Sequence, residues 1–89
     1  MNKQEIFPKL VDILCQSLNL EITDVTLHST LINDLGAESI DFLDIIFRVE
    51  REFGIKIQRG DLFPENDNVN IQAFNVEMLQ DYIYSRLVK

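Results

Sequence analysis

Ser39 is the residue of this chain whose position is best suited to chemistry, because it follows Gly36 and Ala37 at the point where a loop gives way to a helix. The first backbone N–H groups of a helix have no intrahelical acceptor, and the helix dipole adds positive potential there. An attached phosphate would therefore be stabilised. A serine at such a boundary also serves as an ordinary N-cap, which is the commoner role when the residue is taken alone. Both roles stay open until its neighbours are considered.

The other reactive residue types give weaker candidates. Asp41 and Asp44 lie three residues apart and resemble a catalytic acid pair, but a convex helix surface does not shift carboxyl pKa values as a cleft does. His28, the sole histidine, is expected at the surface, and Cys15, the sole cysteine, is expected to pack near the end of a helix. With only three glycines as well, the sequence predicts no catalytic residue, no usual zinc site and no glycine-rich nucleotide loop.

Three amphipathic helices are predicted to position this serine. The first runs from about residue 4 to 17, where apolar residues recur three and four apart. Pro8 must lie in or near its first turn, since a proline deeper inside removes a helical hydrogen bond. The second helix covers residues 39 to 53 and ends before Gly54, which suits a left-handed cap. The last covers residues 76 to 87.

The connections between these helices carry fewer signals. Residues 19 to 38 are unusually apolar for a loop and must pack on the core. Their alternation around residues 23 to 27 resembles a strand, but no partner strand is evident, so a sheet is rejected. Asp61 is expected to cap a short helix, and Asn75 is expected to cap the last helix. The predicted fold class is therefore all-α, with three main helices, one short helix and a long first connection in a single domain over residues 1 to 89.

The second helix carries apolar side chains on two opposite faces when its residues are placed at 100° intervals. The face expected in the core comprises Phe42, Ile45, Ile46, Val49 and Phe53. Ile40 and Phe47 fall on the opposite side among charged residues, and Leu43 lies at the boundary. This composition is typical of a contact patch, although scattered exposed apolar residues are ordinary in proteins.

The net charge of −7 is distributed unevenly along the chain, with seven acidic residues and no lysine or arginine between residues 10 and 47. Such a surface repels nucleic acid and anionic membranes and attracts basic protein surfaces, although acidity alone also serves solubility. No apolar run is long enough to cross a bilayer, and no secretory signal is evident at the start. Together with the lone cysteine, these features predict a cytoplasmic protein.

The segment around Ser39 resembles the acyl carrier protein family, whose pattern is Asp-Leu-Gly-Ala/Met/Val-Asp-Ser-Leu-Asp/Glu followed by an acidic helix and a Glu-Phe-Gly-Ile type ending. The matching residues here are Asp34-Leu35-Gly36-Ala37-Glu38-Ser39-Ile40-Asp41 and Glu52-Phe53-Gly54-Ile55. The closing helix from residue 75 to 83 is also similar, so the resemblance covers nearly the whole chain.

The resemblance implies a four-helix, acyl-carrier-like bundle that catalyses nothing itself. A phosphopantetheinyl transferase would move 4′-phosphopantetheine from coenzyme A to Ser39. The thiol of that arm would then hold acyl groups as thioesters and present them to enzymes of fatty acid, lipid or polyketide synthesis. The expected partners are this transferase and acyl-loading and acyl-using enzymes with basic surfaces, and the carrier is expected to be a monomer.

The same resemblance implies roles for the side chains around the arm. The surface expected to meet partner enzymes comprises Glu38, Ile40, Asp41, Leu43, Asp44, Phe47, Arg48, Glu50 and Arg51. The residues expected to part and shelter an acyl chain are Phe42, Ile46, Val49, Phe53, Leu79 and Ile83.

Three departures from the family pattern favour a specialised carrier over the housekeeping one of fatty acid synthesis. Glu38 replaces the usual aspartate, Arg48 and Arg51 interrupt an otherwise acidic face, and the segment from 61 to 74 is longer than usual. Other readings remain open: a carrier of aminoacyl or peptidyl groups, an unmodified helical interaction module, and a small acidic regulator of a basic partner.

Overall fold

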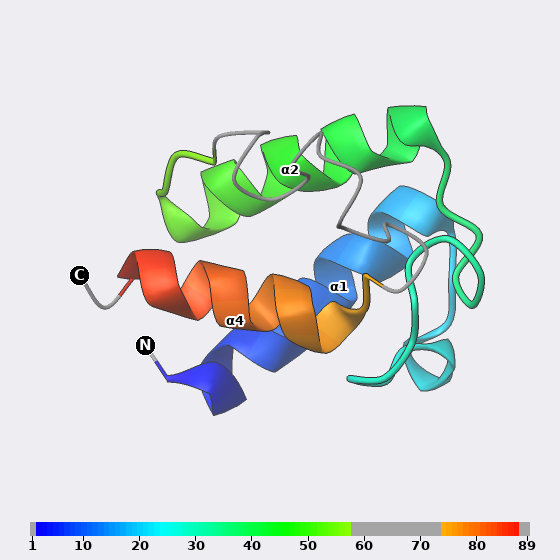
Figure 1. Ribbon diagram of the computed structural model, residues 1–89, viewed down its shortest axis with the longest axis horizontal. Coiled ribbons are helices and arrows are strands. Elements are labelled where there is room, and N and C mark those ends of the chain that lie inside the picture. Colours follow the sequence, from blue (N-terminus) through cyan, green and yellow to red (C-terminus); the bar gives the residue numbers. More distant parts are fainter. Residues whose placement is uncertain (1, 58–73, 88–89) are drawn as a thin grey trace.

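Helices form the regular structure of the described part of the chain (Figure 1). The computed structural model describes residues 2–57 and 74–87, which contain α1 (Lys3–Leu18), the short 3-10 helix η1 (Ile22–Asp24), α2 (Ser39–Phe53) and α4 (Val76–Leu87). Within these two stretches the only β-type pairing is one isolated antiparallel bridge between Thr30 and Asn75. The all-α prediction is confirmed, and the expected short helix at Asp61 lies outside the described residues.

Helix α1 begins slightly earlier than the sequence predicted because Asn2 and Glu5 form a capping box. The Asn2 Oδ1 atom accepts the Glu5 N–H at 2.9 Å, and the Glu5 Oε1 atom accepts the Asn2 N–H at 3.2 Å. Pro8 is therefore the sixth residue of the helix, in the second turn and near the first, as predicted. The helix continues through this position because the proline is exposed and removes a hydrogen bond only near the helix end.

Helices α2 and α4 have the bounds that the sequence predicted. Gly54 adopts a φ of 65° and its N–H donates to the Glu50 carbonyl at 2.9 Å, which forms the expected left-handed cap of α2. Asn75 Oδ1 accepts the Met78 N–H at 2.9 Å and caps α4. Among the described helices, none is both long and apolar enough to cross a membrane.

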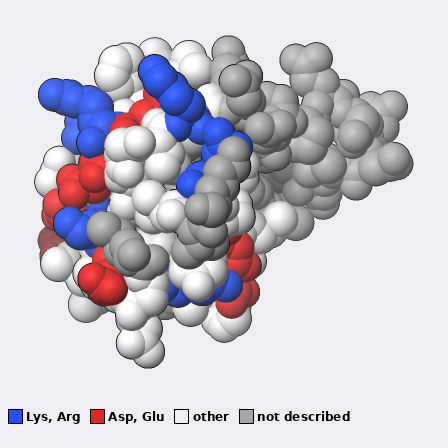
Figure 2. Space-filling model, turned by 90° about the vertical axis from the view of Figure 1, so that its left-hand side faces the viewer, with Lys and Arg blue, Asp and Glu red and all other residues white. Residues whose placement is uncertain are grey.

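Charged groups are distributed differently at the two ends of α2. This helix runs from Ser39 toward the end of the molecule where α4 also finishes (Figure 1). Arg51 and Arg86 lie in the last turns of α2 and α4. Figure 2 looks onto this end and shows Lys and Arg side chains interspersed with Asp and Glu. Basic and acidic side chains therefore both occur at this end, whereas the stretch from residue 10 to 47, which contains Ser39, has acidic residues and no lysine or arginine.

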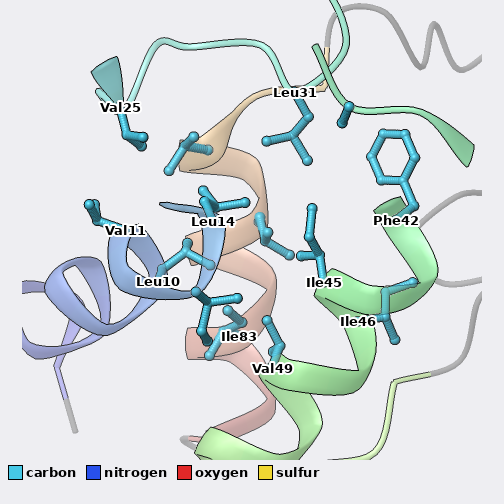
Figure 3. Packing of buried hydrophobic residues seen from close by; sticks show 14 of the residues in the cluster. Leu10, Val11, Leu14, Val25, Leu31, Phe42, Ile45, Ile46, Val49 and Ile83 are labelled. Carbon is cyan, nitrogen blue, oxygen red and sulfur yellow. The ribbon is translucent and has the colours of Figure 1, made fainter. Parts of the chain in front are cut away.

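The core lies where the helices and the 19–38 connection meet, and side chains from these elements point into a shared interior (Figure 3). Helix α1 contributes Ile6, Leu10, Val11, Ile13 and Leu14, and α4 contributes Val76, Leu79 and Ile83. The buried residues of α2 are the predicted ones: Phe42, Ile45, Ile46, Val49 and Phe53. Val49 and Ile83 have no exposed surface, which confirms the helical periodicity as the source of the core.

The long connection packs on the core as predicted, with one exception. Val25, Leu31 and Leu35 are buried. Ile22, however, is 71% exposed, because the single turn of η1 directs its side chain to solvent. The prediction that this loop packs on the core is therefore confirmed, and Ile22 is an exposed apolar residue within it.

Backbone hydrogen bonds tie the long connection to the start of α4. The Val76 N–H donates to the Ser29 carbonyl at 3.0 Å, and the Glu77 N–H donates to the Leu27 carbonyl at 3.0 Å. The Leu31 N–H donates in turn to the carbonyl of residue 74 at 3.1 Å. We call these three bonds the α4 clasp. They anchor the loop that precedes Ser39.

Candidate functional site

The turn that leads into α2 is built by residues 34–37. The Asp34 carboxylate accepts the Thr30 N–H at 2.9 Å, and the Thr30 hydroxyl accepts the Asp34 N–H at 3.1 Å. Ala37 is buried, and its N–H donates to the Leu31 carbonyl at 2.8 Å. Residues 34–37 therefore form a hydrogen-bonded turn that sets the direction in which the chain enters α2 at Ser39.

Gly36 is required in this turn by its backbone conformation. Its φ is +74°, a region that side-chain-bearing residues rarely adopt, and an added Cβ would meet no atom within 4 Å. The glycine is therefore needed for its dihedral angle, and the space around it is open. This open space lies three residues before Ser39 in the chain.

Ser39 is the first residue of α2, and the structure describes it through its backbone. The Asp41 and Phe42 N–H groups both donate to the Glu38 carbonyl, at 2.9 and 3.2 Å. The N–H groups of Ser39 and Ile40 precede them and have no intrahelical acceptor by helix geometry. An open turn beside these donors, at the positive end of the dipole, fits a phosphate ester.

Asp41 stabilises the start of α2 from within the helix. Its carboxylate accepts the Glu38 N–H at 2.8 Å, which satisfies a donor that the helix itself leaves free. Glu38 is exposed, whereas Asp41 is only partly exposed. Both residues belong to the predicted partner surface, and Asp41 has an additional structural role there.

An apolar strip follows Ser39 along the exposed face of α2. We use this name for Ile40, Leu43 and Phe47, which are 71, 48 and 64% exposed. Their spacing of three and four residues places them in one row about 10 Å long. The prediction that Ile40 and Phe47 face away from the core is confirmed, and Leu43 lies on the same side.

Asp44 and Arg48 are engaged with each other and with α1. The Asp44 Oδ2 atom accepts the Ser17 hydroxyl at 2.7 Å and the Arg48 Nε–H at 2.8 Å, and Arg48 Nη1 also donates to Gln16 Oε1 at 3.1 Å. The Ser17 hydrogen bond, followed by the Arg48 hydrogen bond, lowers the pKa of Asp44 below its ordinary value of 3.8. We call these four side chains the α1–α2 network.

Glu50 is likewise used within the chain. Its carboxylate accepts the Ile57 N–H at 2.9 Å and so supports the segment that follows the Gly54 cap. The side chain is partly buried. Sequence reasoning missed this role and the hydrogen bond from Ser17 to Asp44, because neither Ile57 nor Ser17 lies at a helical spacing from its acidic partner.

The residues predicted to shelter an acyl chain are all buried in the same core cluster (Figure 3). They come from α2 and α4: Phe42, Ile46, Val49, Phe53, Leu79 and Ile83. Cys15 is partly buried near the end of α1, and burial followed by the charges of nearby carboxylates raises the pKa of its thiol. His28 is exposed, as predicted.

Comparison with known sequences connects this site to a protein family. Residues 8–71 match the family described as "Phosphopantetheine attachment site". The chain is 39% identical over 61 residues to the acyl carrier protein of Thermotoga maritima, which covers 68% of this chain and 75% of that protein. It is 31% identical over 87 residues to the acyl carrier protein of Guillardia theta, which covers 98% of both chains.

A third relative is the acyl carrier protein AcpXL of Rhizobium etli, 45% identical over 51 residues, or 57% of this chain and 55% of that protein. The matched part thus spans only about half of that relative's length. The helical fold, the turn ahead of Ser39 and these matches lead to one conclusion: the chain belongs to the acyl carrier protein family, whose phosphopantetheine attachment region it contains.

Proposed function

We propose that this protein carries acyl intermediates on a 4′-phosphopantetheine arm attached to Ser39. The observation that supports this assignment is the position of Ser39 at the first residue of α2, directly after the open turn at Gly36. The family match from residue 8 to 71 includes this serine, and the description of that family identifies phosphopantetheine as the attached group. The alternative that Ser39 is a plain N-cap was wrong, because Glu38 occupies the N-cap position and Ser39 is the first residue within the helix.

The attachment is a group transfer in which Ser39 is the acceptor. The serine oxygen forms a new P–O bond to the phosphate of coenzyme A nearest the pantetheine. The bond from this phosphorus to the rest of the diphosphate breaks, and 3′,5′-adenosine diphosphate leaves with its electrons. The hydroxyl proton of the serine passes to the transferase. When attached, the cofactor supplies a terminal thiol that holds an acyl group as a thioester. The chain itself contributes the rigid turn, the helix end and the surface that enzymes recognise.

Fatty acyl or related lipid cargo is favoured over aminoacyl cargo. The relatives from Thermotoga maritima and Guillardia theta are both named acyl carrier proteins. The buried apolar side chains of α2 and α4, which include Phe42, Ile46 and Ile83, suit a hydrocarbon chain. We expect one monomeric carrier domain that acts in the cytoplasm with its transferase and with acyl-loading and acyl-using enzymes.

Intact-mass spectrometry tests the attachment. The purified protein is incubated with coenzyme A, magnesium and a broad-specificity phosphopantetheinyl transferase, and we expect a gain of one phosphopantetheinyl group. Ser39→Ala should abolish the gain. Ser85→Ala is the matched control, since Ser85 is an exposed serine on α4 and should not affect modification. No gain in the wild type, or a gain that persists in Ser39→Ala, would contradict the proposal.

The role in a dedicated pathway has its own test. Arg48 and Arg51 on α2 distinguish this surface from a uniformly acidic one. We therefore expect slow turnover when this protein replaces the housekeeping carrier in a reconstituted bacterial fatty acid synthase. Turnover comparable to that of the housekeeping carrier would show that no specialisation exists.

A further inference from the structure

The exposed row of α2 ends in a positive charge. Ile40, Phe47 and Arg51 are separated by seven and four residues, so at 100° per residue Arg51 lies within about 20° of Ile40 around the helix. The row from Ile40 to Arg51 is about 16 Å long at 1.5 Å per residue. An enzyme that covers the apolar strip along its length will therefore also meet the guanidinium of Arg51.

Charges beside this row are already paired. Asp44 accepts both Ser17 and Arg48, so the α1–α2 network is neutral as a unit. Lys9 Nζ lies 3.3 Å from Glu52 Oε2 and bridges α1 to the last turn of α2. Neither pair leaves a full unit charge to attract an approaching surface.

Arg51 is the exception among the described cations of α2. It is exposed and makes no ion pair with any residue in the described stretches. It lines a groove of about 370 Å³ between α1 and α2, and the other lining residues are Asp12, Ile13, Gln16, Arg48 and the Lys9-paired Glu52. Asp12 is itself bonded to Gln16 at 3.1 Å, so its carboxylate is partly satisfied. The groove gives a partner's side chain room to reach Arg51.

The opposite end of the row has the opposite sign. Glu38 and Asp41 lie beside Ser39, and no lysine or arginine occurs between residues 10 and 47. Along the exposed face of α2, the side chains nearest Ser39 are therefore acidic, those of the apolar strip follow, and Arg51 at the far end is basic. A carrier whose recognition helix is acidic along its whole length complements a uniformly basic enzyme surface. The positive charge of Arg51 makes the present helix a poorer complement to such a surface.

Building on the proposed function, we propose that Arg51 determines which enzymes this carrier serves. Its partner is an acyl-handling enzyme that presents Lys or Arg toward Glu38 and Asp41, an apolar pocket toward Phe47, and an Asp or Glu toward Arg51. An enzyme with a uniformly basic docking surface places a like charge against Arg51 and is disfavoured. Specificity of this kind comes as much from repulsion of wrong partners as from attraction to the right one.

The test uses a bacterial malonyl transferase chosen for a uniformly basic carrier-binding surface, with the phosphopantetheinylated protein as acceptor. The measured quantity is kcat/KM for malonyl transfer. We expect Arg51→Gln to raise it about fivefold and Arg51→Glu about thirtyfold, since one unit of charge at roughly 4 Å in water changes a rate about fivefold and two such steps multiply. Lys3→Glu is the matched control, because it changes the charge equally but lies on α1 against Asp81 of α4, 2.8 Å away.

A second arm changes the enzyme. Each Lys or Arg around the entrance of the transferase is replaced by Glu in turn, and each variant is assayed with the wild-type and Arg51→Glu carriers. We expect one replacement to raise kcat/KM for the wild type and lower it for Arg51→Glu, which is the signature of a direct charge pair. A purely structural effect of residue 51 would not reverse sign in this way.

The outcomes separate this inference from the proposed function. Equal effects of Arg51→Glu and Lys3→Glu, or no enzyme position coupled to residue 51, would overturn the role of Arg51 while leaving the carrier function intact. A wild type that gains no phosphopantetheinyl group would overturn both. Circular dichroism verifies that the variants keep their helices, and if Arg51→Glu does not, the Arg51→Gln variant supplies the same comparison.

Discussion

Replacing Gly36 by alanine tests whether the turn ahead of Ser39 has a role separate from overall stability. The change adds a single methyl group at a φ of +74°, where it would meet no atom within 4 Å. No steric clash therefore contributes, and only the backbone conformation is strained. Gly54 provides a matched control, because it has a φ of +65° and equally open surroundings at the other end of α2.

The expected loss of stability is the same at both positions. The left-handed conformation costs an L-residue about 1–2 kcal/mol. Alanine restricts the unfolded chain more than glycine does, which offsets about 0.4–1 kcal/mol. We therefore expect Gly36→Ala and Gly54→Ala each to lower the free energy of unfolding by about 1 kcal/mol, and Tm by about 4–8 °C.

The two variants should differ in modification. Gly36→Ala shifts the turn that delivers Ser39, and small displacements of a reacting group slow its reaction strongly. We expect kcat/KM for phosphopantetheinyl transfer to fall about tenfold in Gly36→Ala and less than twofold in Gly54→Ala. Urea titrations measure the stability, and intact-mass time courses measure the transfer.

Equal slowing in both variants would refute the reasoning, since modification would then follow global stability rather than the geometry of the turn. An unchanged free energy of unfolding in Gly36→Ala would refute the assigned φ strain directly.

Two further substitutions test the core and the α1–α2 network. Ile45→Ala, at a side chain only 2% exposed, should lower the free energy of unfolding by about 3 kcal/mol. Phe47→Ala, on the exposed apolar strip, should change it by less than about 0.5 kcal/mol. Comparable losses of stability in urea titrations of the two variants would contradict the assigned faces of α2. The pKa of Asp44 lies below its ordinary 3.8 in the folded protein, so the network stabilises the fold above pH 3.8 and this contribution is lost as the pH falls through the lower folded pKa. The stability difference between wild type and Asp44→Asn should be under about 1 kcal/mol at neutral pH and should shrink in acid, and a difference that grows in acid would contradict the network.

The fold was largely predictable because its signals are local. The apolar periodicity of α2, with Gly54 after its last turn, determines both the ends of the helix and its buried face. The same holds for α4, which Asn75 caps through Met78. The start of α1 was predicted one residue too late, because the capping box of Asn2 and Glu5 extends the helix to Lys3. That capping box was readable in the sequence.

The charged residues of the site were harder to predict. Asp44 bonds to Ser17 of α1, and that contact depends on how the two helices align, which periodicity within one helix does not determine. Glu50 bonds to Ile57 beyond the end of its helix. Both were assigned to partner contacts from the family resemblance. The role of Asp41 could have been predicted, because its contact with Glu38 is local. An acidic residue three positions into a helix commonly accepts the N–H of the capping residue, and the assignment of Asp41 to partner contacts overlooked this.

The α4 clasp has a consequence for how freely this protein can change over evolution. Its donors and acceptors are backbone groups of residues such as Leu27, Ser29 and Val76, so almost any amino acid at these positions preserves the bonds. Proline is excluded where an N–H donates, at residues 31, 76 and 77, and burial in the core keeps Leu31 and Val76 apolar. The exposed residues of this loop can therefore diverge while the attachment to α4 persists, and alignments of those positions will understate how closely the loop geometry is retained.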